Sequence, residues 1–98
     1  MENFKKLTKL HQNDNVLVVI VNLKNGDVVE YDNTTYHLFQ DINLGHKIAT
    51  KDIQKGDKII KYNVVIGSAT ANIKKGEHVH VHNMTSDFIE SHLIDEEK

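Results

Sequence analysis

The sequence contains no cysteine among its 98 residues, which excludes disulfide bonds and thiolate chemistry. A chain without cysteine suits a reducing compartment, so we expect the protein in the cytoplasm. The sequence also lacks an N-terminal apolar run followed by a small-residue cleavage site, and no stretch approaches the ~20 apolar residues that a membrane helix needs. These absences predict a soluble, unexported protein with no membrane partner.

The sequence also lacks an excess of charge of one sign. The chain has 12 basic and 14 acidic residues, which give a formal net charge of -2, and no basic stripe of the kind that follows a phosphate backbone. We therefore expect no nucleic-acid partner. A Gly-rich phosphate loop, a Gly-X-Ser-X-Gly elbow and an HEXXH motif are absent too, and the dispersed acids give a paired-carboxylate site no support.

The length of the chain limits the kind of site it can form alone. A domain of this size buries only about two-thirds of the surface that its unfolded chain exposes, so we expect one modest core. A shallow site completed by another chain is therefore favoured over a deep, enclosed one. The oligomeric state stays open at this point, a homo-oligomer included.

Short segments rich in β-branched and aromatic residues predict a mostly β structure. These segments are 16–21, 28–31, 34–39, 58–66 and 78–82. The first is a continuous apolar run, which is typical of a central strand buried on both faces. In the segment 58–66 we expect Val64 and Ile66 to pack inward and Gly67 to turn the chain.

No segment before residue 84 has a sustained helical period, whereas the C-terminus carries a helix-start signal. Asp87 is a plausible N-cap with Glu90 three residues later, and an apolar stripe of Phe88, Ile89 and Leu93 follows. We therefore predict a β domain of short strands and turns over residues 1–84 and a short helix or tail over residues 85–98.

An eight-residue pattern occurs four times: Asn or Asp, aliphatic, two variable residues, Gly, an acid, one variable residue, aliphatic. The copies are Asn22–Val29, Asp41–Ile48, Asp52–Ile59 and Asn72–Val79. The Asx side chain can bond its own backbone two residues on, the glycine supplies a positive φ, and the two aliphatics point into a shared core. Each copy is thus expected to turn the chain and restart a strand, giving a compact, irregular β structure.

The copy Asp41–Ile48 departs from the pattern at one position. The other copies place Asp27, Asp57 or Glu77 after the glycine, whereas this copy places His46 there, followed by Lys47. The turn itself has no evident need for an imidazole. Two interpretations stay open: a functional histidine, or a surface turn that tolerates one.

Three histidines alternate with valines in the stretch GEHVHVHN, residues 76–83. In a strand, His78, His80 and His82 would share one face while Val79 and Val81 face the core. Two imidazoles that are about 6.5–7 Å apart at Cα can converge on one metal ion, but three in a row span too far. Two of them with His46 as a third ligand is the more physical arrangement, although a solvated histidine-rich face explains the pattern as well.

Four segments in order resemble the SAF domain of the altronate and galactarate dehydratase family. They are Leu10–Val16, Gly45–Ala49, Lys61–Ala69 and Gly76–Asn83, and the resemblance covers residues 7–84. It implies a β-clip fold and a role in a lyase that removes water from a sugar acid such as altronate or galactarate. It also implies a divalent metal, typically Fe²⁺, with Mn²⁺ or Zn²⁺ as alternatives.

The resemblance further implies a large catalytic subunit as partner, without which we expect this chain to be inactive. It implies His46, His80 and His82 as metal ligands and His46 and Lys47 as catalytic residues. Lys47 would pair with a substrate carboxylate, Asn83 would bind substrate by orienting a neighbour, and His78 would be peripheral. Two alternatives remain: the small subunit of a sulfolactate sulfo-lyase, and a non-catalytic module that binds a sugar acid or a protein.

Overall fold

The computed structural model describes residues 5–87, and this part contains short strands and no helix. The strands are β1 (Leu7–Thr8), β2 (Val16–Val19), β3 (Val28–Tyr31), β4 (Thr34–His37), β5 (Lys47–Ala49), β6 (Lys58–Lys61), β7 (Val64–Ala69), β8 (His78–Val79) and β9 (Met84–Thr85). The prediction of a small, mostly β domain is thus confirmed. The expected C-terminal helix lies outside the described residues, apart from Asp87, and the division at residue 84 stays a prediction.

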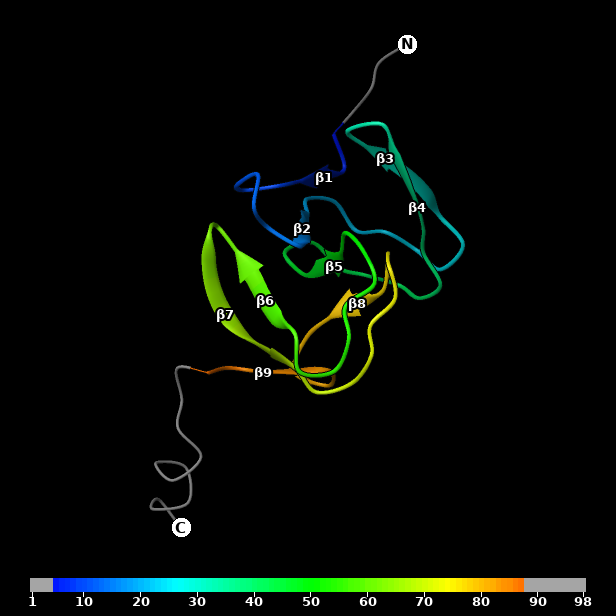
Figure 1. Cartoon of the computed structure of the whole chain (residues 1–98). Coiled ribbons are helices and arrows are strands. Elements are labelled where there is room, and N and C mark those ends of the chain that lie inside the picture. The colour runs from blue at the N-terminus through cyan, green and yellow to red at the C-terminus, as the bar shows by residue number, and fades with distance from the viewer. Residues whose placement is uncertain (1–4, 88–98) are drawn as a thin grey trace.

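The strands form three antiparallel sheets. The central sheet has the order β1-β2-β5-β8, a second sheet is the β3–β4 hairpin, and a third has the order β6-β7-β9. In Figure 1 the two hairpins, β3–β4 and β6–β7, lie on opposite sides of the central sheet. Strand β5 lies in the interior of the central sheet, and β8 lies at its edge.

A tight turn divides one segment that the sequence pattern predicted as a single strand. The expected segment 58–66 divides at Tyr62 and Asn63, whose φ values are 56° and 61°, as in a hairpin turn with two left-handed residues. Two of our expectations for this region are wrong: Val64 is 48% exposed, and Gly67 lies inside β7 rather than in a turn. Ile66 does pack against a core cluster, as predicted.

The four repeats are turns that pair two by two. An antiparallel bridge joins Leu23 to Ile42, and an equivalent bridge joins Ile53 to Ile73. Every repeat glycine has a positive φ, between 85° and 95°, which confirms the expected backbone conformation. All eight aliphatic positions of the pattern are buried, as predicted.

The Asx side chains act differently from the prediction, because each bonds the partner turn instead of its own. Asn22 Oδ1 accepts the amide hydrogen of Leu44, and Asp41 Oδ1 accepts that of Asn25. The second pair repeats this reciprocal arrangement, from Lys55 to Asn72 and from Lys75 to Asp52. The Asx side chain of each repeat thus links two turns by a hydrogen bond.

The expected single core is divided into two clusters, one for each pair of turns. The first core contains Leu7, Leu17, Val19, Leu23, Val29, Tyr36, Leu38, Ile42 and Ile48. The second core contains Val16, Ala49, Ile53, Ile59, Ala69, Ile73 and Val79. Neighbouring residues of β2 and β5 enter different cores because successive side chains of a strand point to opposite faces. The central sheet therefore separates the two cores.

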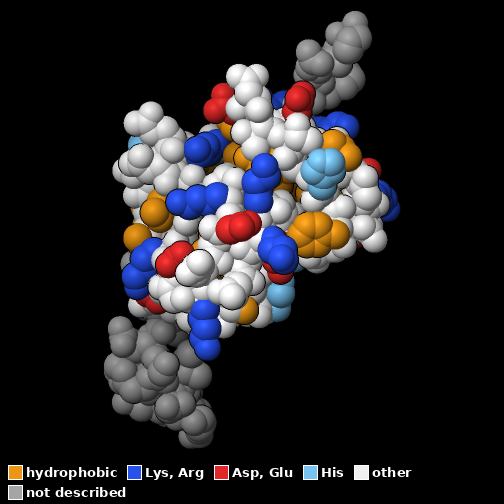
Figure 2. Space-filling model, turned by 45° about the vertical axis from the view of Figure 1, so that its right-hand side comes forward, with side chains coloured by type: hydrophobic (Ala, Val, Ile, Leu, Met, Phe, Trp, Pro, Cys, Tyr) orange, Lys and Arg blue, Asp and Glu red, His pale blue; other side chains and the backbone are white. Residues whose placement is uncertain are grey.

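The surface carries both signs of charge. On the face seen in Figure 2, lysine and acidic side chains are interspersed, and apolar side chains form separate patches. In the part of the chain that the structure describes, no helix is long and apolar enough to cross a membrane.

Candidate functional site

His46 occupies a turn position that frees its side chain from the turn. In the three other turns, Asp27, Asp57 and Glu77 accept a backbone amide hydrogen from the residue three positions earlier, at 2.8–3.0 Å. His46 keeps the backbone part of the turn, since its N–H donates to the carbonyl of Asn43 at 3.1 Å. Its imidazole instead lies 3.0 Å from another ring, between His46 Nδ1 and His78 Nε2.

The register of two strands explains why these histidines meet. Strand β5 pairs antiparallel with β8, with Lys47 opposite Val79 and Ile48 opposite His78. Continuing this register by one residue places His46 opposite His80. Since alternate residues of paired strands share a face, the three imidazoles of His46, His78 and His80 come to one side of the sheet.

These three residues form a compact group, which we call the histidine cluster. One ring nitrogen from each lies within 4.8 Å of the other two. The ring centroid of His46 is 5.0 Å from that of His78 and 4.9 Å from that of His80, and the rings of His78 and His80 stack 5.4 Å apart. His82 lies beside the group, with its ring centroid 5.3 Å from that of His78.

The prediction of a strand over residues 78–82 is wrong, and the difference changes which histidines converge. Strand β8 ends at Val79, and the chain then turns, so Val81 is 79% exposed instead of facing a core. His78, expected at the periphery, is one of the three members of the histidine cluster. His82 is exposed at its edge. The sequence could have indicated His78 only through the pairing register with His46, which no periodicity shows.

Asn83 holds this turn in place. Its side-chain oxygen accepts the amide hydrogen of His80 at 2.9 Å, and its side-chain nitrogen donates to the carbonyl of His78 at 2.8 Å. The residue is buried, with 3% of its surface exposed. Asn83 thus orients its neighbours by hydrogen bonds, and it does so through the backbone of the residues that carry the imidazoles.

Burial, together with neighbouring basic groups, favours the neutral imidazoles of His78 and His80. Burial, together with His46, His82, His80 and Lys47, lowers the pKa of His78 from 6.5 to about 4. The pKa of His80 is also lowered, by loss of hydration and then by the charge of Lys47. A neutral imidazole has a free lone pair, which is the form that binds a metal ion.

The donor set of the histidine cluster fits a divalent metal. Imidazole nitrogen suits Zn²⁺ and Fe²⁺, and three protein ligands leave coordination positions open for water or substrate, as in catalytic metal sites. Within residues 5–87 this is the group of histidine and acidic side chains whose ligand atoms come close enough together to hold an ion. His46, His78 and His80 would supply the ligands.

A hollow of about 440 Å³ lies against the histidine cluster and shares His80 with it. It is lined by Lys47, Thr70, His80, Val81, Met84, Thr85 and Ser86. Burial, and to a lesser degree Lys61, lowers the pKa of Lys47. A small anion in this hollow would contact an ammonium group and an imidazole together, and sequence reasoning identified only these two of its lining residues.

Comparison with known proteins gives consistent matches. Residues 5–87 match the family described as the altronate/galactarate dehydratase SAF domain. The chain is 49% identical over 75 residues to an altronate dehydratase of Escherichia coli, which covers 76% of this chain and 15% of that protein. It is 39% identical over 79 residues to an altronate dehydratase of Bacillus subtilis, covering 81% of this chain and 16% of that protein.

A third relative is much shorter. The alpha subunit of a (2R)-sulfolactate sulfo-lyase from Chromohalobacter salexigens is 36% identical over 83 residues, covering 76% of this chain and 88% of that protein. The chain therefore spans about one-sixth of the altronate dehydratases that it matches and most of this sulfo-lyase subunit.

Proposed function

Since this chain belongs to the altronate/galactarate dehydratase SAF domain family, we propose that it is the metal-binding part of a lyase that removes water from a sugar acid. The observation that carries the proposal is the convergence of His46, His78 and His80 beside a hollow that contains Lys47. A metal site alone is compatible with many functions. A metal site next to the ammonium group of Lys47 fits a substrate that bears both a carboxylate and hydroxyl groups.

Each residue of the site has a proposed role. His46, His78 and His80 hold the metal, with His78 in the place first assigned to His82, because its ring nitrogen lies nearer to the other two. When bound, a divalent ion such as Fe²⁺, Mn²⁺ or Zn²⁺ supplies a Lewis acid that polarises the substrate carboxylate and hydroxyl. Lys47 pairs with the carboxylate of the substrate and so fixes its orientation.

His82 and Asn83 support this arrangement. His82 lies beside His78, with the two ring centroids 5.3 Å apart. Asn83 fixes the backbone from which His78 and His80 project, so its effect on substrate is exerted through them. The base that removes the proton next to the carboxylate is proposed to lie on a large catalytic partner, since the three histidines of this small domain are only partly buried.

The existence of that partner is supported by the relatives. Two altronate dehydratases contain a matching segment as a small part of a much longer chain, and a relative of similar length is itself called a subunit. We therefore propose that this domain works with a large catalytic unit and is inactive alone. The sulfo-lyase relative also favours a second candidate reaction, in which sulfite instead of water leaves the substrate.

Metal analysis of the purified chain tests the proposal. Titration calorimetry with Fe²⁺ under anaerobic conditions, and with Mn²⁺ and Zn²⁺, should give one site per chain. Alanine at His46, His78 or His80 should abolish binding, whereas His37→Ala, in β4 and exposed, should leave it intact. Equal binding by all four variants would refute the metal site. A wild-type chain that binds a sugar acid but no metal would favour a non-catalytic binding module instead.

A further inference from the structure

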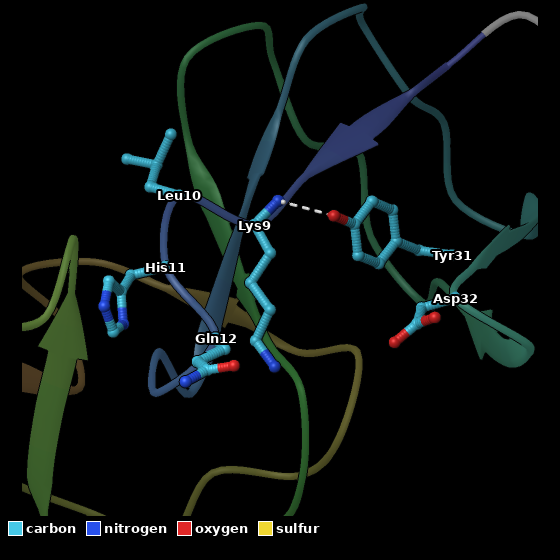
Figure 3. Close-up of a pocket in the computed structure, with 6 residues that line it drawn as sticks. All are labelled: Lys9, Leu10, His11, Gln12, Tyr31 and Asp32. Carbon is cyan, nitrogen blue, oxygen red and sulfur yellow. Dashed lines mark hydrogen bonds between the residues drawn. The ribbon is translucent and has the colours of Figure 1, made fainter.

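A second hollow lies between the loop that follows β1 and the tip of the β3–β4 hairpin, at the motif Leu10–Val16 that the proposed function does not use (Figure 3). Its volume is about 590 Å³, and its lining is Lys9, Leu10, His11, Gln12, Tyr31 and Asp32. An adjoining hollow of about 260 Å³ shares Lys9, Tyr31 and Asp32 with it and adds Leu17, Thr34, Tyr36, Thr50 and Lys51. We call the two together the hairpin groove.

The walls of the hairpin groove are fixed by hydrogen bonds. The backbone N–H of Lys9 donates to the hydroxyl of Tyr31 at 3.2 Å, which ties the loop to the hairpin (Figure 3). The backbone N–H of His11 donates to Asp14 at 3.0 Å, and Asn13 N–H donates to His11 Nδ1 at 3.1 Å. A neutral His11 ring must then carry its proton on Nε2, where it is a donor.

Within residues 5–87, no ion pair involves the charged groups of the hairpin groove. In the described part of the chain, residues 5–87, the ion pair found is Lys58–Asp87, so Lys9, Lys51 and Asp32 have no ionic partner. In the view of Figure 3 the ammonium group of Lys9 lies between the Gln12 amide and the Asp32 carboxylate. The groove thus carries two cations, one anion, an amide and several hydroxyl groups.

We infer that the hairpin groove binds a small polyhydroxy carboxylate. The two lysines give the groove a positive balance, which favours an anionic group near Lys9 and Lys51. The Asp32 carboxylate accepts hydrogen bonds from hydroxyl groups, and Gln12 both donates and accepts them. The ring of Tyr31 offers an aromatic surface with a fixed hydroxyl for the carbon chain to lie against.

This groove is separate from the histidine cluster. His46 directly precedes β5, whereas Thr50 and Lys51 directly follow it, so the two sites lie at opposite ends of that strand. Four residues of extended chain correspond to about 13 Å. No residue that lines the groove belongs to the histidine cluster, so we expect binding in the groove to require neither the metal nor a catalytic partner.

An NMR titration of the metal-free, ¹⁵N-labelled chain tests the inference. Gluconate is the probe, and sorbitol, which has the same carbon chain without the carboxylate, is its matched control. Gluconate should shift the amide signals of Lys9, Gln12, Tyr31 and Asp32 saturably, while sorbitol at equal concentration should not. The inference is overturned if gluconate does not shift the amide signals of these residues. It is also overturned if sorbitol or the amino acid alanine shifts them equally.

Four variants assign the effect to the groove. Lys9→Gln and Asp32→Asn should each weaken gluconate binding by roughly tenfold or more, since each removes a charge-assisted hydrogen bond. Asparagine suits the positive φ of 54° at position 32, so the hairpin should be kept. Lys24→Gln, an exposed lysine in another turn, should bind gluconate normally. His37→Ala, exposed in β4, should also bind it normally. Gluconate-induced shifts at Lys47 and His80 in place of those at Lys9 and Asp32 would put the ligand at the histidine cluster and overturn the inference.

Discussion

Asp57 and His46 occupy the same position in two copies of the repeated turn, but their side chains contact different groups. The Asp57 carboxylate accepts the amide hydrogen of Gln54 at 3.0 Å and so closes its own turn. The His46 ring lies 3.0 Å from the ring of His78, across the gap between two strands. One difference in a repeated turn thus replaces a local hydrogen bond by a side chain that contacts the neighbouring strand β8.

This exchange predicts opposite effects on stability and binding. His46→Asp should abolish metal binding, because it removes one of three imidazoles, yet leave the free energy of unfolding unchanged or raise it by about 1 kcal/mol through the restored turn bond to residue 43. Urea unfolding and metal titration of the same sample measure both effects. The matched variant Asp57→His should lower the free energy of unfolding by about 1 kcal/mol and leave metal binding intact. A strongly destabilised His46→Asp would contradict this account.

The lowered pKa of His78 predicts a dependence of stability on pH. In the metal-free chain its ring should titrate near pH 4, well below the ordinary value of 6.5, because it is partly buried among other basic groups. The unfolded chain then binds the proton first, so the stability contributed by neutral His78 is complete above about pH 6.5 and falls as the pH drops toward 4. NMR titration of the ring and urea unfolding at several pH values test this. The His78→Gln variant should show a smaller slope, and a ring that titrates near 6.5 would disprove the environment described.

Removing the side chain of Asn83 should damage both the turn and the metal site. Asn83→Ala leaves His80 N–H and His78 C=O without their partners in a buried position, which costs about 1–3 kcal/mol of unfolding free energy. Metal affinity should fall as well, because both imidazoles lose their fixed backbone. Thermal unfolding and calorimetry give the two readouts. Asn25→Ala, an exposed asparagine in another turn, should change neither, and an unaffected Asn83→Ala would show that the turn is held by other contacts.

Gly67 is predicted to be required for the contact between β7 and β9. A Cβ at this position would overlap the carbonyl oxygen of Thr85 and come within 2.7 Å of Met84 Cε. Gly67→Ala should therefore lower the free energy of unfolding by about 1–3 kcal/mol, since either the strands move apart or Met84 repacks. Val65→Ala, two residues earlier and partly exposed, is the control and should cost less. Equal unfolding midpoints for the two variants would refute the close approach.

Much of the fold could be predicted from local patterns because the repeats encode it. The spacing of Gly26 and its three counterparts indicated turns with positive φ, and Leu23 and Val29 with their counterparts indicated the core. Strand β3 was predicted with its observed bounds. These features depend on residues close in sequence, which is why the sequence was sufficient.

The remaining features depend on contacts between distant residues. Asn22 bonds the turn that contains Leu44, and no spacing rule shows which turns are partners. The pattern His-X-His-X-His fits a strand, yet the bonds from Asn83 end that strand at Val79, so the place of His78 in the cluster became clear only from the pairing of β5 with β8. Val64 is apolar but lies at the exposed tip of a hairpin, where burial cannot be deduced from alternation.

The central sheet has a consequence for hydrogen exchange. Strands β2 and β5 each contribute side chains to both cores, with Leu17 and Ile48 on one side and Val16 and Ala49 on the other. Opening either core alone leaves the other still packed against these strands, so their amides exchange with solvent only when the whole domain opens. The hairpins β3–β4 and β6–β7 each rest on a single core and can open separately. We therefore expect the strand that begins directly after His46 to be among the slowest-exchanging segments, which would give the histidine cluster a rigid base.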